Sequence, residues 1–261
     1  MKCFGTRAGE GNTALVLLGH AADAEARQAF AKAANKSACV FVDPGSDGAA
    51  WTLDYFYPHM RSPLCLHATL AAARVLLAEA AGPLTARTAM RGQELALTRS
   101  GDGAFVALSR QDAPVVTPAA GDADLDGLAK RLLGALTLAS APAVASVGSP
   151  KLLVEVTDSA ALHALQPDLA AIARWGKAAG VSGIYAWCRR PDGSFEGRNF
   201  NHLDPALEDS ATGVAAGALT VHLGRSLDLY QGAHLGQPCL LRTQLDGNRI
   251  LIGGAAEFVH K

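Results

Sequence analysis

The chain has 261 residues, of which 49% are hydrophobic and 18% are charged, and its formal net charge is −1 at pH 7. This length suits one large domain or two of ordinary size, with enough apolar residues to fill a packed core. The balanced charge, without a basic stripe, argues against nucleic-acid binding, and no apolar run approaches the roughly 18 residues of a membrane-spanning helix.

The first half of the chain mixes strand patterns with two helix patterns. The expected elements are, in chain order, a helix over 22–34, strands over 38–42 and 51–57, a helix over 68–80, and strands over 94–98 and 104–108. Ser100-Gly101-Asp102-Gly103 separates the last two strands, which predicts a β-hairpin. The 68–80 segment is nearly all small or apolar, so we expect this helix to be buried on most sides.

The second half repeats this mixture. Its expected elements are a helix over 125–138, a strand over 151–156, one or two helices within 159–179, strands over 183–188 and 198–201, a helix over 212–223, and strands over 238–243 and 249–253. Leu245-Asp246-Gly247-Asn248 predicts a hairpin between the last two strands. The 212–223 helix matches the 68–80 helix in its small, apolar composition.

Ala68-Thr69 and Ala211-Thr212 each follow titratable residues and open a run of small helix formers. A buried helix in each half, surrounded by strands, predicts an α+β fold of two similar halves, each a sheet wrapped round a central helix. The proline-bearing stretch 112–118 is the expected divide, which gives halves of 1–112 and 113–261, with a last strand free to return to the first half. Two facing helix N-termini would make an anion-binding cleft with acid and base groups at its rim.

The cysteine pattern favours a reduced protein. The five scattered cysteines include no C-x-x-C spacing, so neither a zinc knuckle nor a redox motif is predicted. The opening segment Met1-Lys2-Cys3-Phe4-Gly5 lacks the apolar core of a signal peptide. We therefore expect a cytoplasmic protein. No nucleotide-binding glycine motif is present, so we expect neither a cofactor nor a metal cluster.

Several motifs, met in a fixed order, carry a resemblance to a known family. Gly11-Asn12-Thr13-Ala14-Leu15-Val16 is similar to G-N-P-A-A-V, and Asn35-Lys36-Ser37-Ala38-Cys39-Val40-Phe41-Val42 is similar to N-x-S-E-T-x-F-V. Phe56-Tyr57-Pro58 and Cys65-Leu66-His67-Ala68-Thr69-Leu70-Ala71 are similar to F-T-P…C-G-H-A-T-L-A. Arg198-Asn199-Phe200 and Glu208-Asp209-Ser210-Ala211-Thr212-Gly213 are similar to R-x-F…E-D-P-A-T-G, and 231–238 is similar to Q-G-x-x-x-G-R-P. The chain thus resembles the PhzF family of phenazine-biosynthesis isomerases and epimerase-like proteins.

This resemblance implies the diaminopimelate-epimerase-like fold, which proline racemase shares. In this fold two pseudo-symmetric halves, each a β-barrel-like sheet wrapped round a central helix, have the active site between them. It also implies a homodimer that acts, without a cofactor, on a small anionic or carboxylate-bearing metabolite. The implied chemistry is proton movement on a carbon next to a carboxylate. Such a reaction needs a positioned base, an acid, and donors for the developing negative charge.

The chain departs from the family pattern at several site positions. The family's principal acid/base, the glutamate of N-x-S-E-T, is Ala38 here, and a methyl group cannot move a proton. Loss of a general base typically costs about 10²–10⁴-fold in rate. The glycine of C-G-H is Leu66, the proline and serine of D-P-A-T-G-S are Ser210 and Val214, and an acidic residue after F-T-P is Arg61.

The residues that remain at matched positions are the candidate site. His67 and Asp209 are the expected proton-transfer residues, because histidine titrates near neutral pH and burial can turn an aspartate into a base. The alternatives are a histidine that bonds a neighbouring carbonyl and an ordinary N-cap carboxylate. The expected substrate-binding residues are Asn12, Ser37, Thr69, Thr212 and Gly213. Scattered cations that could recognise an anion, or simply be solvated, are Arg7, Arg61, Arg198 and His202.

Cys65 is the third catalytic candidate. It lies just before a helix N-terminus, where a thiolate is stabilised, and cysteine-based members of the wider fold use a thiol at a comparable place. Cys65, or Cys39 beside the lost glutamate, would then replace the missing base. The alternative is a buried, inert thiol.

Three interpretations of function stay open. The first is a PhzF-like isomerase or epimerase in which His67 and Asp209 share proton transfer. The second is a catalytically degenerate relative that binds a small anionic ligand without turnover, which Ala38, Leu66 and Val214 favour. The third is a purely structural or interaction module.

Overall fold

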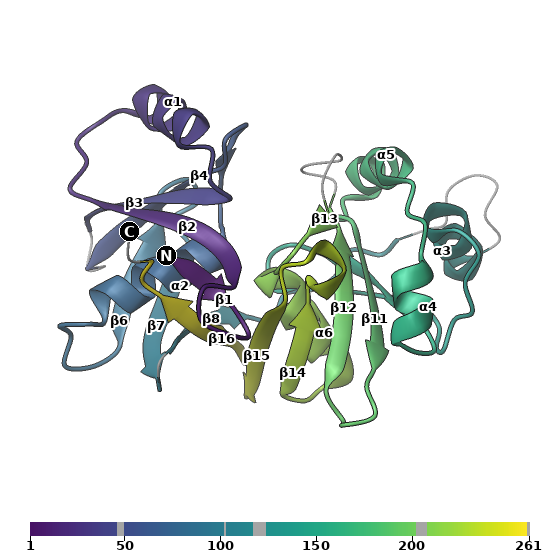
Figure 1. Cartoon of the computed structure of the whole chain (residues 1–261). Helices are drawn as coiled ribbons and strands as arrows, with labels where there is room; N and C mark the ends of the chain where they lie inside the picture. Colours follow the sequence, from purple (N-terminus) through teal and green to yellow (C-terminus); the bar gives the residue numbers. More distant parts are fainter. Residues whose placement is uncertain (46–49, 102, 117–123, 202–207, 260–261) are drawn as a thin grey trace. The chain divides into compact units, whose positions relative to one another are not determined.

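The computed structural model describes residues 1–45, 50–101, 103–116, 124–201 and 208–259 (Figure 1). The chain forms two compact units, one of Met1–Leu108 with Leu251–Lys261 and the other of Ser109–Ile250. Each unit mixes strands and helices. Within the described ranges, no helix is long and apolar enough to span a membrane.

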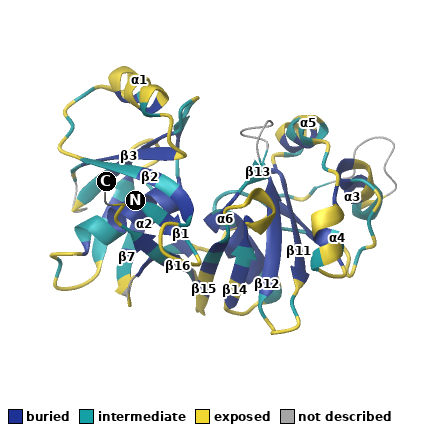
Figure 2. Cartoon of the chain, in the orientation of Figure 1, coloured by how far each residue is buried: buried dark blue, intermediate teal, exposed yellow. Residues whose placement is uncertain are grey.

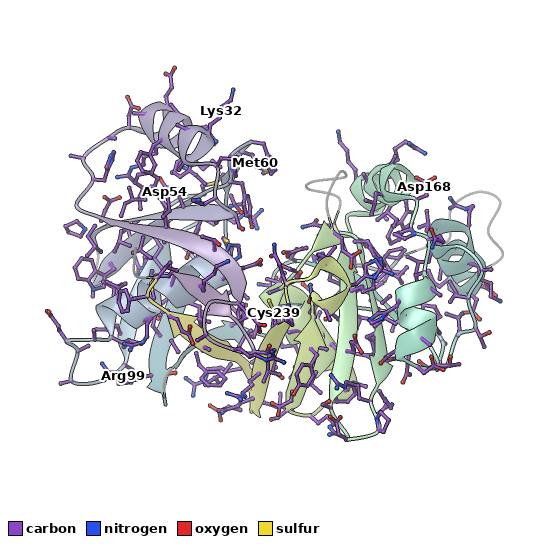
Figure 3. The ribbon with its side chains drawn as sticks, in the orientation of Figure 1. Lys32, Asp54, Met60, Arg99, Asp168 and Cys239 are labelled. Atoms are coloured by element: carbon purple, nitrogen blue, oxygen red, sulfur yellow. The ribbon has the colours of Figure 1, made fainter. Side chains whose placement is uncertain are left out.

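The described residues form six α-helices: α1 (Ala24–Ala34), α2 (Leu66–Leu76), α3 (Leu125–Leu133), α4 (Ser159–Ala164), α5 (Leu169–Ala179) and α6 (Gly213–Leu223). Four of them begin at an aspartate whose carboxylate accepts a hydrogen bond from the N–H three residues further on, which satisfies a free donor of the first turn. These N-caps are Asp23, Asp124, Asp158 and Asp168, the last labelled in Figure 3. α2 and α6 begin instead at Cys65 and Thr212, which make no such side-chain cap.

The first unit contains β1 (Lys2–Phe4), β2 (Gly11–Leu18), β3 (Ala38–Pro44), β4 (Trp51–Phe56), β5 (Arg61–Ser62), β6 (Leu84–Thr88), β7 (Glu94–Ser100), β8 (Gly103–Ser109) and most of β16 (Arg249–Glu257). Eight of these strands follow one another in the order β1-β2-β3-β4-β6-β7-β8-β16, and β16 pairs back with β1, which closes a barrel. β5 pairs with β4 outside this path.

The central helix of this barrel is α2. It packs against β1, β2, β3 and β7, and every residue from Leu66 to Ala73 is buried. Its many alanines let the surrounding strands approach closely. Figure 2 shows the contrast with α1, whose outer side is exposed. The prediction of a helix buried on most sides is therefore confirmed.

The other face of β3 is covered by α1. Val40 pairs with Tyr55 on β4, and the Tyr55 hydroxyl reaches Thr69 of α2, so alternate residues including Ala38 face inward. Cys39 and Phe41 face outward and pack with Ala31, Phe56 and their neighbours.

A buried ionic network also holds α1 to the sheet. Arg27 of α1 contacts Asp43 at 2.8 Å and Asp54 at 3.2 Å, and Arg61 contacts Asp54 at 2.8 Å. Asp54, labelled in Figure 3, is 3% exposed, so its charge depends on these two partners.

The second unit contains β9 (Ala143–Ala145), β10 (Lys151–Glu155), β11 (Ile184–Arg189), β12 (Phe195–Phe200), β13 (Glu208–Asp209), β14 (Leu227–Gln231) and β15 (Cys239–Asp246), with a 3₁₀ turn at Ala233–Leu235. The strand order is β9-β10-β11-β12-β14-β15, with β13 paired to β12. α6 packs on one face, against β9, β10, β14 and β15. A core that includes Leu128, Leu162 and Ile172 from α3, α4 and α5 covers the other face.

Most predicted elements are present and differ at their ends. The helix expected over 125–138 stops at Leu133, because Gly134 leaves the helical conformation with φ of 85°. The strand expected over 38–42 runs on through Asp43 and Pro44, which pair with Thr52 and Trp51. Strands β1, β2, β5, β6, β9, β13 and β14 lie outside the sequence predictions.

Candidate functional site

Cys65 and His67 lie together at the start of α2. The Cys65 sulfur is 3.5 Å from Nδ1 and 3.8 Å from Nε2 of His67. Both side chains are buried. Since residues i and i+2 of a helix do not face each other, the contact depends on the extended backbone of Cys65, which precedes the first helical turn.

The pKa of the Cys65 thiol is lowered from its ordinary value. Burial alone would raise it, but the charge and hydrogen bond of His67 outweigh burial, and Tyr57 and the Ala68 N–H add to the effect. The Ala68 amide is one of the free donors of the first turn, where a thiolate is favoured. The Cys65 sulfur makes no capping hydrogen bond of ordinary geometry with the first turn. The Ala68 amide therefore stabilises the thiolate by electrostatic attraction.

The other candidates of the first unit occupy different surroundings. The Thr69 hydroxyl donates to the Cys65 carbonyl at 2.9 Å and lies 2.7 Å from the Tyr55 hydroxyl, so it links α2 to β4. Asn12 is buried on β2, opposite Cys3. Ser37 is exposed, directly before β3.

Two departures from the family pattern are buried in the same unit. Ala38, in the place of the family glutamate, is 1% exposed, and Leu66 is 6% exposed at the start of α2. Cys39 lies on the opposite face of β3, in the apolar cluster under α1. Burial there, with a smaller effect of Cys65, raises the pKa of Cys39 to about 11. This thiol stays protonated near neutral pH, which leaves Cys65 as the candidate thiolate base.

In the second unit, Asp209 lies at the start of α6. Thr212 donates its hydroxyl to Asp209 Oδ2 at 2.5 Å, and the Ala211 N–H donates to Oδ1 at 3.4 Å. Gln231 donates to the Asp209 carbonyl at 2.7 Å and to the Thr212 hydroxyl at 3.1 Å. These bonds hold Asp209 beside Gly213, the first helical residue, although Thr212 and not Asp209 occupies the N-cap position.

Sequence reasoning missed three polar residues on the α6-facing side of this sheet. Tyr185 donates its hydroxyl to Gln231 Oε1 at 3.1 Å and crosses Gly197, where a Cβ would stand 2.2 Å from that hydroxyl. Asn199 and Lys151 are also fully buried. A signal was available, because Lys151 opens an apolar strand pattern and so interrupts the continuous apolar run expected of a strand buried on both faces.

Two of the four candidate anion-binding cations are engaged within the protein. Arg61 pairs with Asp54. Arg198 makes two hydrogen bonds to Glu208, at 2.9 and 2.7 Å, and donates to the Leu162 carbonyl at the end of α4. Arg7 is exposed, and His202 lies outside the described residues. No group of three or more His, Cys, Asp or Glu side chains is placed to hold a metal ion in the described ranges.

Comparison with known proteins identifies the family. A family model described as phenazine biosynthesis-like protein, PhzC-PhzF, matches residues 1–261. An uncharacterized isomerase from Deinococcus radiodurans is 32% identical over 281 residues, which cover 97% of this chain and 89% of the relative. The trans-2,3-dihydro-3-hydroxyanthranilate isomerase of Pseudomonas aeruginosa is 31% identical over 242 residues, covering 85% and 80%.

Solved structures share the fold. A Bacillus anthracis PhzF family protein has a TM-score of 0.79 at 23% identity, covering 99% of this chain and 95% of that one. A predicted epimerase from Pseudomonas aeruginosa has a TM-score of 0.75 at 26% identity, covering 100% and 98%. A hydroxyproline epimerase from Agrobacterium vitis is more distant, with a TM-score of 0.57 at 14% identity, covering 91% and 80%. The chain therefore belongs to the PhzF family of phenazine biosynthesis-like proteins.

Proposed function

We propose that this protein is a cofactor-independent isomerase or epimerase that moves a proton on a carbon next to the carboxylate of a small metabolite. The observation that carries the proposal is the contact between Cys65 and His67 at the start of α2. It supplies a titratable pair in a family whose usual glutamate is Ala38 here. The name of the Pseudomonas aeruginosa relative supports cyclic, anthranilate-like acids as the substrate class.

The proposed step begins at the Cys65 thiolate. The thiolate takes a proton from the carbon beside the carboxylate, and the electron pair of the broken C–H bond is delocalised toward the carboxylate-bearing system. An isomerase returns a proton to a different carbon, and an epimerase returns it to the opposite face of the same carbon. His67 is the proposed acid for this return, and it recovers its proton from the Cys65 thiol that it contacts. Asp209, as a carboxylate, is the second proposed proton-transfer group. The substrate therefore neither gains nor loses atoms overall.

The free N–H groups of α2 and α6 support carboxylate binding. The other four helices in the described ranges are capped by their own aspartates, whereas these two lack a side-chain cap. Uncapped first-turn amides favour anions. We therefore propose that the backbone at Gly213, with Thr212, Thr69, Asn12 and Ser37 as the remaining binding candidates, serves the substrate's carboxylate.

The order of strand pairings in the two units is consistent with an internal duplication. The parallel pairs β2–β3 and β4–β6 alternate with the antiparallel pairs β3–β4 and β6–β7 in the first unit. The same succession recurs in β10–β11, β11–β12, β12–β14 and β14–β15 of the second. We propose two related halves, each with one central helix whose start serves the reaction.

A second candidate function is anion binding without turnover. Ala38 is inside the packed barrel, so the family's acid/base is replaced by a core methyl group. A protein that only binds gains stability from its ligand, about 2.7 kcal/mol at a hundredfold excess over Kd. It shows this gain without any exchange of substrate protons.

Solvent deuterium exchange tests the proposed reaction. The protein is incubated in D₂O with anthranilate-type and amino-acid carboxylates, and loss of C–H signal is followed by NMR. We expect exchange with the wild type and a fall of at least about 10²-fold in Cys65→Ser, the usual cost of losing a general base. Asp209→Asn is expected to slow exchange as well, because it removes a proposed proton-transfer carboxylate.

The matched control is Cys188→Ala. Cys188 is also free and buried, but it lies in the apolar core of the second unit, where burial raises its pKa. Its exchange rate should equal that of the wild type. Equal rates in Cys65→Ser and the wild type would contradict the role of the thiol, and binding without exchange in the wild type would favour the anion-binding alternative.

A further inference from the structure

Four polar side chains share the α6-facing side of the second unit's sheet. Tyr185 pairs directly with Asn199, and Asn199 pairs with Asp209. Leu153 pairs with Tyr185 on the other side, so Lys151, two residues before it, projects to the same face. The set of Lys151, Tyr185, Asn199 and Asp209, called here the inner polar cluster, therefore comes from four neighbouring strands.

Lys151 is buried without an ion pair. It is 1% exposed, and its ammonium group donates to the Ser182 carbonyl. That carbonyl is well fixed, because the Ser182 hydroxyl donates to the Pro150 carbonyl at 2.7 Å. No carboxylate lies within ion-pair distance of Lys151 among the described residues, but the charge of Asp209 acts on it from further away.

Among the described residues, Asp209 is the one charged side chain that shifts the pKa of Lys151. The Tyr185 hydroxyl faces the inner polar cluster, but burial raises its pKa well above the ordinary value, so it stays neutral. β9, on the other side of β10, carries only Ala143, Val144 and Ala145. The nearest ionisable side chain of α6, His222, packs against Trp187.

Asn199 marks the inner polar cluster as incomplete. Neither its Nδ2 nor its Oδ1 has a hydrogen-bond partner among the described residues, although the side chain is fully buried. Such groups are rare, because each costs about 1–3 kcal/mol when left unpaired. A lysine and an unpaired amide beside the uncapped start of α6 are poor core residues but good ligand-binding ones.

We propose that Lys151 determines the affinity of this site for anionic ligands, by supplying the positive charge that offsets Asp209 at the start of α6. With Lys151 protonated, Lys151 and Asp209 are together neutral, and a carboxylate ligand meets the free amides of α6 without repulsion. With Lys151 neutral, Asp209 leaves a net negative charge there. This proposal rests on the proposed function, because it takes the α6 start to be the carboxylate subsite.

The pH range of the effect follows from burial. Burial lowers the pKa of Lys151 to about 7, with Asp209 acting in the opposite direction. Carboxylate binding should therefore be strong at pH 6 and weaken as the pH rises through 7 and 8. Lys151 acts through Asp209 and the α6 amides as a positioning residue, so its effect should appear in Kd or KM rather than in kcat.

Binding of two probes tests this proposal. The Kd of anthranilate, a carboxylate, and of anthranilamide, its neutral counterpart, is measured by calorimetry from pH 6 to 8.5. For the carboxylate we expect about tenfold weaker binding at pH 8.5, the change that about 1.4 kcal/mol corresponds to. Lys151→Arg, which stays charged, should bind tightly throughout, and Lys151→Met should bind weakly throughout. Anthranilamide should bind independently of pH.

A second measurement does not depend on activity or on ligand binding. In wild-type protein carrying ¹³C-labelled lysine, one Cε signal should titrate near pH 7, disappear in Lys151→Met, and move to lower pH in Asp209→Asn. The proposal would be overturned if the pKa read from the Lys151 signal were unchanged in Asp209→Asn. It would also be overturned if carboxylate binding had the same pH dependence in Lys151→Arg as in the wild type. If carboxylate binding depends on pH but no deuterium exchange occurs, the proposed role of Lys151 is supported and the proposed isomerase activity is contradicted.

Discussion

Cys65 differs from the other buried cysteines by its neighbours. All five cysteines are free and buried. Cys39 and Cys188 lie in apolar clusters, where burial raises the pKa of each thiol. Cys65 is as deeply buried, yet the imidazole of His67 reverses the direction of its shift. Burial alone therefore does not set the direction in which the pKa of a thiol shifts in this protein, because an adjacent charge can reverse it.

His67→Gln should raise the pKa of Cys65. The variant keeps a polar side chain of similar reach but removes the charge that opposes burial, so the thiolate should form only at higher pH. The thiolate is followed by its absorbance near 240 nm as the pH is raised, with Cys65→Ser subtracted to remove the other thiols. An unchanged midpoint would show that the α2 amides, and not His67, stabilise the thiolate.

Asn199→Leu should stabilise the protein and impair its binding. The substitution removes an unpaired buried amide at similar volume, so we expect the free energy of unfolding in urea to rise by about 1 kcal/mol. Thermal stabilisation by 3-hydroxyanthranilate should fall at the same time, because the amide is available to the ligand. A gain in stability with unchanged ligand response would assign Asn199 no part in binding.

At the scale of elements, the sequence predicts helices better than strands. The 68–80 and 212–223 helices are recognised by their small residues, and each begins within about one turn of its expected start. The strands β1 and β13 have only three and two residues. Such short strands are defined by pairing with distant partners, so the local sequence pattern does not predict them. The Cys65–His67 contact follows from a motif. The inner polar cluster does not, because it depends on the register of four strands.

Arg27→Met should release α1 from the first unit. Arg27 is the ionic partner of both Asp43 and Asp54, and its removal leaves Asp43 without this cation and the buried Asp54 with Arg61 alone. Loss of one member of a buried ionic group typically costs about 3–5 kcal/mol. We expect a loss of that size in chemical denaturation and faster amide hydrogen exchange within α1.

The triple variant Arg27→Met, Asp43→Leu, Asp54→Leu separates charge from packing. It replaces the carboxylates by apolar side chains of similar size and should recover part of the lost stability. Arg61, the other partner of Asp54, is more exposed and can be solvated. If the triple variant were no more stable than Arg27→Met, the loss would come from the packing of the arginine stem instead.

At the scale of the whole molecule, Lys151 makes stability depend on pH. Its pKa is about 7 when folded and has an ordinary value of 10.5. Between these values the unfolded chain binds a proton that the folded chain has released, so the free energy of unfolding rises with pH. One group contributes at most about 1.4 kcal/mol per pH unit. Below pH 7 both states hold the proton, and this contribution is absent.

The expected result is a difference between wild type and Lys151→Met that changes with pH. Urea denaturation at pH 6, 7, 8 and 8.5 should show the wild type gaining stability relative to Lys151→Met from pH 7 upward. Lys177→Met, an exposed lysine near the end of α5, is the matched control and should run parallel to the wild type. The comparison of variants cancels the contributions of other groups whose pKa is shifted in the fold, among them Cys65 and the N-terminal amine. A constant difference between wild type and Lys151→Met would mean that Lys151 keeps its proton in the fold.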